Sequence, residues 1–176
     1  MTGVDVMVVN EKLATTRLEW DQVIQGVRAA TIKSLLAGTA IFRFASTKNP
    51  RTGEPIPSTS WARGPWWFAE RDYRTILMRY QTGALGLGTV ARAAGAVQPS
   101  WSLMDVSIKA YLRYDTEVYV GTGKTQYRDP LPNGMFMTLS GWPDIEQIYI
   151  PGLRGPAFVT LEIVRKKIVT TDGWGF

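Results

Sequence analysis

The sequence of 176 residues contains neither cysteine nor histidine. The lack of cysteine excludes disulfide bonds, thiol nucleophiles and zinc or iron–sulfur sites built on cysteine. The lack of histidine excludes Ser-His-Asp and Cys-His catalysis, an imidazole general base and a metal site of the HExxH type. If the protein is an enzyme, its chemistry must therefore come from carboxylates, hydroxyls and guanidinium groups, together with any substrate or cofactor that it binds.

Long apolar segments are also missing. The longest apolar run, Leu35 to Phe42, is interrupted by Gly38 and Thr39 and is far too short to cross a bilayer. Met1 to Asn10 lacks the basic region and the apolar stretch of a signal peptide. We therefore expect a cytoplasmic protein without membrane contact, whose delivery into another cell would require a route that needs no signal peptide.

The composition is that of one globular domain, which we place at residues 1–176. Apolar residues make up 45% of the chain, enough for a hydrophobic core. Lys and Arg number 20 against 15 Asp and Glu, which gives a net charge of +5. This excess favours anionic partners such as nucleotides, nucleic acid or an acidic protein. The densest basic run, Arg165 to Lys167, is typical of a solvated strand end.

Residue periodicity predicts helices mainly in the first two thirds of the chain and strands mainly in the last third. A capping box at Thr16 and Glu19 begins a predicted helix from Leu18 to Ala37. Further helices are predicted over residues 72–80, 89–97 and 99–111, and strands over 39–45, 66–69, 116–120, 135–139, 146–150 and 158–169. We expect an α+β fold in which N-terminal and central helices pack on a mixed, mainly antiparallel, split β-sheet.

Three short segments carry the side chains that are candidates for chemistry. Arg43 lies inside the apolar strand Ile41–Phe44, where a buried guanidinium must find a partner. The hydroxyl cluster Ser58-Thr59-Ser60 precedes an aromatic stretch, and the carboxylates Asp144 and Glu146 precede an apolar strand. A purely structural interpretation is also open: an ion pair for Arg43, turn residues for the hydroxyls and a strand-edge charge for Glu146.

In their order, these segments resemble the Arg, Ser-Thr-Ser and Glu pattern of mono-ADP-ribosyltransferases, in the Arg–Ser–Glu branch that includes bacterial and phage toxins. The resemblance covers three short pieces between residues 41 and 152. It departs from the family at Ser58–Ser60, which follow Pro57 in a predicted loop instead of opening a core strand. It also departs at Asp144, where Glu or Gln is usual, and this leaves the acceptor preference open.

The resemblance implies an enzyme that uses NAD as its substrate and needs no metal. Cleavage of the nicotinamide–ribose bond builds positive charge on the ribose, as in glycoside cleavage. By resemblance, Glu146 stabilises that charge, Arg43 holds the pyrophosphate through its bidentate fork, and Ser58 or Ser60 (Ser60 as the catalytic candidate) holds the carboxylate in place. The residues implied in NAD binding are Arg43, Ser58, Thr59, and the aromatic side chains Trp67 and Tyr73 as stacking faces for nicotinamide.

The same resemblance implies a macromolecular acceptor, protein or nucleic acid, for the ADP-ribose. Water as the acceptor would make the protein an NAD hydrolase. A toxin or effector role is implied as well, together with an inhibitory antitoxin or immunity protein as partner.

Two alternatives from other functional classes remain open. Arg63, Arg71 and Arg74 are interleaved with aromatic residues, which favours a non-enzymatic protein that binds nucleic acid or another subunit. Gly86 to Ala91 matches a dinucleotide-binding fingerprint with Ala last, which would indicate an oxidoreductase if a strand preceded it.

Overall fold

The computed structural model describes residues 6–10, 13–130 and 136–171. Its central element is a seven-stranded sheet in the order β11-β6-β4-β5-β10-β7-β3. The strands are β1 (Val6–Asn10), β2 (Leu13–Thr16), β3 (Val27–Leu35), β4 (Ala40–Ala45), β5 (Trp66–Ala69), β6 (Val106–Leu112), β7 (Thr116–Gly123), β8 (Gln126–Pro130), β9 (Phe136–Leu139), β10 (Glu146–Tyr149) and β11 (Leu161–Ile168). The helices are α1 (Arg17–Gly26), α2 (Glu70–Thr82) and α3 (Leu87–Gly95), with the 3-10 turns η1 (Trp61–Arg63) and η2 (Pro156–Thr160).

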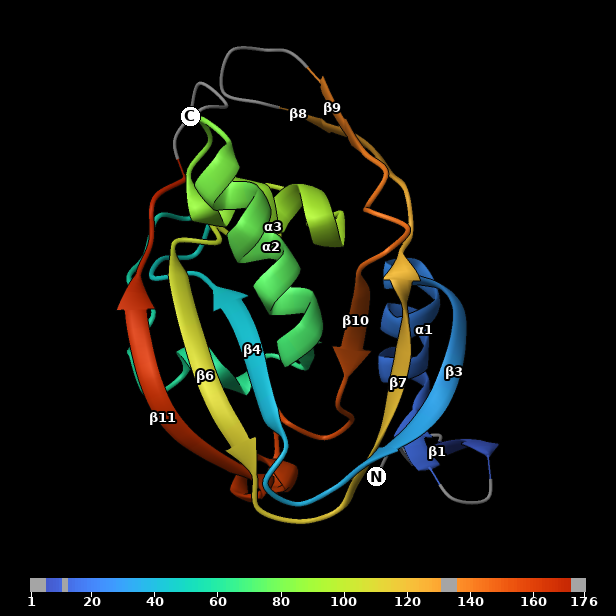
Figure 1. Ribbon diagram of the computed structural model, residues 1–176. Helices are drawn as coiled ribbons and strands as arrows, with labels where there is room; N and C mark the ends of the chain where they lie inside the picture. The colour runs from blue at the N-terminus through green and yellow to red at the C-terminus, as the bar shows by residue number, and fades with distance from the viewer. Residues whose placement is uncertain (1–5, 11–12, 131–135, 172–176) are drawn as a thin grey trace.

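The predicted α+β class is confirmed. Figure 1 shows α2 and α3 on one face of the sheet and α1 beside β7 and β3. Each strand pair of this sheet among the described residues is antiparallel, so the parallel component implied by a mixed sheet is not found there. No helix of the described part of the chain is long and apolar enough to span a membrane.

The sheet divides at β5, which is only four residues long. Trp66 and Trp67 pair with β10, whereas Phe68 and Ala69 pair with β4. Among the described strands, β4 and β10 share no pairing with each other. The short bridging strand therefore joins two half-sheets, and the predicted split of the sheet lies at this strand.

Strand β4 separates two clusters of the core. Phe42 and Phe44 pack with residues of α2 and α3, while Ile41 and Ala45 belong to the cluster on the other face. Because side chains alternate along a strand, Arg43 shares the face of Ile41 and Ala45 and points away from α2 and α3. This register is what places a charged side chain at the split of the sheet.

The predicted helix from Leu18 to Ala37 is wrong in its second half. The capping box is present, since Glu19 N–H donates to Thr16 Oγ1 and Thr16 N–H donates to Glu19 Oε2. The helix nevertheless ends at Gly26, and the chain continues as β3, which pairs with β7. A Cβ on Gly26 would lie 2.5 Å from Trp66 Cζ2, so the end of the helix packs directly on that indole. Pairing with β7 outweighed the helical periodicity.

The predicted helix over residues 99–111 is also wrong. Residues 99–101 form a turn, and β6 begins at Val106 and pairs with both β4 and β11. A strand buried between two neighbours is apolar on both faces, and such a run cannot be told from a buried helix by periodicity. The last predicted strand likewise begins with η2 and becomes a strand only at Leu161.

We expect Thr16→Ala to lower the free energy of unfolding by about 1 kcal/mol, because it leaves a backbone N–H at the start of α1 without its acceptor. Denaturant titration followed by circular dichroism measures the change. Thr59→Ala is the matched control, since Thr59 is exposed and makes no side-chain hydrogen bond in the described residues. Equal stability of the two variants would contradict a stabilising role for the capping box.

Candidate functional site

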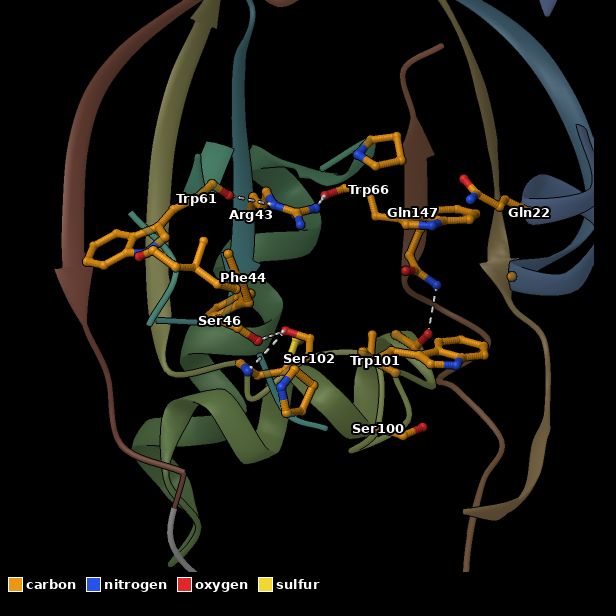
Figure 2. A pocket seen from close by; sticks show the side chains of 18 of the residues that line it. Gln22, Arg43, Phe44, Ser46, Trp61, Trp66, Ser100, Trp101, Ser102 and Gln147 are labelled. Atoms are coloured by element: carbon orange, nitrogen blue, oxygen red, sulfur yellow. Dashed lines mark hydrogen bonds between the residues drawn. The ribbon is translucent and has the colours of Figure 1, made fainter. Parts of the chain in front are cut away.

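A cavity of about 850 Å³ lies at the split of the sheet. Figure 2 shows Arg43 on the β4 side and Gln147 on the β10 side, with Trp66 between them. The lining includes the polar or charged residues Gln22, Gln25, Arg43, Ser46, Asn49, Arg51, Ser60, Ser100, Ser102, Gln147 and Arg154, and the aromatic residues Phe44, Trp61, Trp66, Phe68 and Trp101. These residues come from distant parts of the chain, as expected of a binding site built by the fold.

The Arg43 guanidinium is held by backbone carbonyls. Its Nε donates to Trp61 O at 3.2 Å and its Nη1 donates to Trp66 O at 2.8 Å. Among the described residues, no carboxylate lies within ion-pair distance of it. Burial, assisted by the nearby positive charge of Arg154, lowers the pKa of Arg43 to about 10. The structural interpretation of Arg43 as an ion pair is therefore not met in the described part of the chain.

Gly64 lies directly against this guanidinium. A Cβ built on Gly64 would be 1.9 Å from Arg43 Nη2 and 2.2 Å from Arg43 Cζ. Only a residue without a side chain leaves room for the arginine in this position. Gly64 therefore makes room for the guanidinium because it has no side chain. The sequence analysis did not identify this role for Gly64.

The cavity carries an excess of positive charge. Arg43, Arg51 and Arg154 line it, and no Asp or Glu is among its described lining residues. Within the described residues, the exposed Arg154 side chain makes no hydrogen bond or ion pair. Cations without counter-charges in a partly enclosed space favour an anionic ligand, because the low-dielectric walls strengthen their field.

Gln147, not the predicted Glu146, is the β10 residue that lines the cavity. Gln147 is 5% exposed, and its Nε2 donates to Gly95 O at 2.8 Å. Its carboxamide oxygen accepts no hydrogen bond from the described residues. Strand alternation turns Glu146 to the opposite face, where its Oε2 lies 3.8 Å from Arg71 Nη2. Side chains alternate between the two faces of β10, so the sequence could have indicated Gln147 as the alternative to Glu146.

The three predicted hydroxyl residues differ in where they lie. Ser60 lines the cavity together with Arg43. Ser58 and Thr59 are exposed and are not among the lining residues, and Ser58 O accepts a hydrogen bond from Lys166 Nζ. The structure thus brings together Arg43 and Ser60, and it leaves Ser58, Thr59 and Glu146 outside the lining.

The predicted stacking role of Trp67 and Tyr73 is corrected, because both rings are buried in the core. Trp67 has no exposed surface, and its Nε1 donates to Gly64 O. Tyr73 is stacked on Phe42 with ring centroids 4.0 Å apart. Neither ring has a free face for a ligand. Trp66, its neighbour in β5, does line the cavity, because adjacent residues of a strand face opposite sides.

Carboxylates gather instead at the end of β10 that contacts α2. Asp144 pairs with Arg79, which lowers the pKa of Asp144. Burial raises the pKa of Asp72, although Arg71 donates to it at 3.1 Å. Among the described residues, no group of three His, Cys, Asp or Glu side chains is placed to hold a metal ion.

The residues on which the two alternative functions would depend make contacts within the protein. Arg71 pairs with Asp72 and Arg74 with Glu70, while Arg63 lies 4.5 Å above the Phe158 ring centroid. The fingerprint Gly86–Ala91 opens α3 and follows helix α2 with no strand between them, in a stretch that the structure describes throughout. A Cβ on Gly88 would lie 2.0 Å from Met104 O, so its backbone is covered by protein. The context that the oxidoreductase interpretation required is absent from this described segment.

No protein-family model and no curated protein matches the sequence. Two solved structures align with most of the chain. Rhs1-CT, in complex with its cognate immunity protein RhsI1, has 12% sequence identity and a TM-score of 0.49, and the match covers 82% of this chain and 84% of that chain. Tne2, in complex with Tni2, has 10% identity and a TM-score of 0.41, and the match covers 83% of this chain and 98% of that one.

We expect Gly64→Ala to displace the Arg43 guanidinium from its carbonyl acceptors, because the added methyl group overlaps it. An anion that binds at Arg43 should then bind at least tenfold more weakly, on the order of 1.4 kcal/mol. Calorimetric titration with ADP-ribose measures the loss, and a thermal unfolding scan verifies that the variant is folded. A folded Gly64→Ala protein with unchanged affinity would contradict the positioning role of Gly64.

Proposed function

We propose that this protein cleaves NAD at the nicotinamide–ribose bond in the cavity at the split of the sheet. The observation that carries the proposal is the half-buried Arg43 guanidinium, which lines the cavity and has no carboxylate partner among the described residues. A charge in that position is stabilised when an anion binds it, and a planar guanidinium matches the paired oxygens of a phosphate. The pyrophosphate of NAD supplies such oxygens.

The chemistry of the bond suits the side chains of the cavity. When the C–N bond between ribose and nicotinamide breaks, its electron pair goes to the pyridinium nitrogen, so nicotinamide leaves as a neutral molecule. No general acid is needed for that departure. The cationic ribose that remains is oriented by polar groups near its hydroxyls, and the unpaired carboxamide oxygen of Gln147 is the candidate for this contact.

Water is the acceptor that this lining favours. No carboxylate lines the described cavity, so no lining side chain is placed to take a proton from a weakly acidic acceptor group. Water can add to C1 of the cationic ribose and lose its proton to solvent, which yields ADP-ribose, nicotinamide and one proton. We therefore propose hydrolysis as the basal reaction, with transfer to a macromolecule, as the family resemblance implies, as the alternative fate of the ADP-ribose.

The proposal includes the biological role that the resemblance implies, a toxin or effector restrained by an inhibitory partner protein. The structure of Rhs1-CT is that of a complex with a cognate immunity protein, which is a partner of this kind. For this chain, a positively charged cavity without acidic residues in its described lining would suit a partner that presents an acidic segment to its opening.

We expect the protein to release nicotinamide from NAD, and Arg43→Gln to lower kcat/KM by at least tenfold. The loss follows from removing the charge-assisted hydrogen bonds to the pyrophosphate. Chromatography of the reaction products measures nicotinamide and distinguishes free ADP-ribose from ADP-ribose attached to a macromolecule. Arg165→Gln makes the same chemical change at an exposed strand residue and should leave the rate unchanged. Nucleic-acid retention without nicotinamide release would favour the binding-protein alternative.

We further expect Gln147→Ala to lower turnover more than Glu146→Ala, because only Gln147 lines the cavity. The two residues are adjacent in β10, so each variant controls for general disturbance of the strand. Initial rates of nicotinamide release give the comparison. The opposite order, with Glu146→Ala the more damaged enzyme, would restore the role that the sequence pattern assigned to Glu146.

A further inference from the structure

Three tryptophans line the cavity, and two of them are already engaged by the protein. Trp61 Nε1 donates to Ile56 O at 2.8 Å. Trp66 packs edge-on against Tyr149, with ring centroids 4.8 Å apart, and also contacts Gly26. Trp101 differs from both: its indole makes no hydrogen bond, aromatic pair or cation–π contact within the described residues, and the residue is 46% exposed.

The segment that carries Trp101, residues 97–103, is fixed by hydrogen bonds from Arg92 and to Ser46. The buried Arg92 donates from Nη1 to Val97 O at 2.9 Å, and from Nη2 to Ser102 O at 2.7 Å and Leu103 O at 3.1 Å. Ser46 Oγ accepts a hydrogen bond from Leu103 N at 2.6 Å. A segment fixed by this many contacts presents its exposed side chain in a defined position.

Both ends of the segment have unusual backbone conformations. Ala96 and Met104 lie in the left-handed region, with φ of 53° and 57°, although neither is a glycine. Such conformations are costly and persist where the surrounding structure enforces them, often at ligand sites. Ala96 is the left-handed C-cap that ends α3, and Met104 is buried, so the backbone on both sides of the Trp101 segment is fixed by the surrounding structure.

We propose that Trp101 is the stacking platform for a planar heteroaromatic ring of the bound dinucleotide. This inference rests on the proposed function, because it takes the cavity to be the NAD site. Figure 2 shows the Trp101 indole below Gln147 in the view, across the cavity from Arg43. The two ends of a dinucleotide offer two such rings, adenine and the nicotinamide pyridinium, and both stack on an indole face.

Binding measurements without turnover test the inference. Calorimetric titrations with ADP-ribose, which carries only the adenine ring, and with nicotinamide mononucleotide, which carries only the pyridinium ring, identify the ring. We expect Trp101→Leu to raise the Kd of one of these ligands about tenfold. Trp101→Phe, which retains a smaller aromatic face, should raise it less. Tyr114→Leu alters an aromatic residue that is 59% exposed outside the cavity and should leave both affinities unchanged.

The outcomes separate this inference from the proposed function. Equal weakening by Trp101→Phe and Trp101→Leu, or wild-type affinity in both, overturns the stacking role, even if NAD is cleaved. Binding that depends on Trp101 without any nicotinamide release overturns the proposed reaction and supports the stacking role. If the wild-type protein binds neither ligand, the inference is overturned, whereas the NAD turnover assay decides the reaction separately.

Discussion

A guanidinium held between two backbone carbonyls, with no carboxylate among the described residues to neutralise it, is the constraint on which the cavity depends. Moving a cation out of water costs several kcal/mol in real proteins, and hydrogen bonds to a charged group return about 1.5–3 kcal/mol each. The bonds from Arg43 to Trp61 O and Trp66 O offset a cost of this size, but they leave the positive charge itself without a counter-charge. Burial lowers the pKa of Arg43 to about 10, with the positive charge of Arg154 as a further cause, so the guanidinium still carries its charge at neutral pH. An anionic ligand would supply the missing stabilisation.

The split of the sheet explains how the fold can hold such a group. Strand β5 pairs with β4 only through Phe68 and Ala69 and with β10 only through Trp66 and Trp67, so the β4–β5 pairing stops at Phe42, just before Arg43. Trp61 in η1 and Trp66 at the start of β5 supply the two carbonyl acceptors of the guanidinium. Gly64, between them in the chain, leaves room for it. Gln147 of the other half-sheet also lines the cavity, so β4 and β10, which do not pair with each other, both contribute to it.

The sequence predicted correctly the elements that are marked by short local patterns. It failed for segments whose secondary structure is determined by pairing with strands far away in the sequence. The capping box at Thr16, the strand Trp66–Ala69 and an arginine within a strand were all recognisable from short patterns. The helix expected beyond Gly26 and the helix expected over residues 99–111 gave way to strands with partners on distant parts of the chain. At the site, Trp66 and Gln147 line the cavity, whereas their predicted neighbours Trp67 and Glu146 do not. A strand alternates its faces, so an error of one position exchanges a core residue for a cavity residue, and only the pairing partners settle which face is which.

Several residues in uncommon settings line this cavity. They are Arg43, which has no carboxylate partner among the described residues, the left-handed Ala96 and Met104, and the exposed Trp101. Natural sequences are locally consistent over most of a fold and depart from consistency mainly where function requires it. Trp101 is one of several large apolar side chains exposed at the surface, and among those of the described residues it is the one that lines the cavity together with Arg43. A bound ligand that carries both a phosphate group and an aromatic ring accounts for both features, because the anion satisfies Arg43 and the ring covers Trp101.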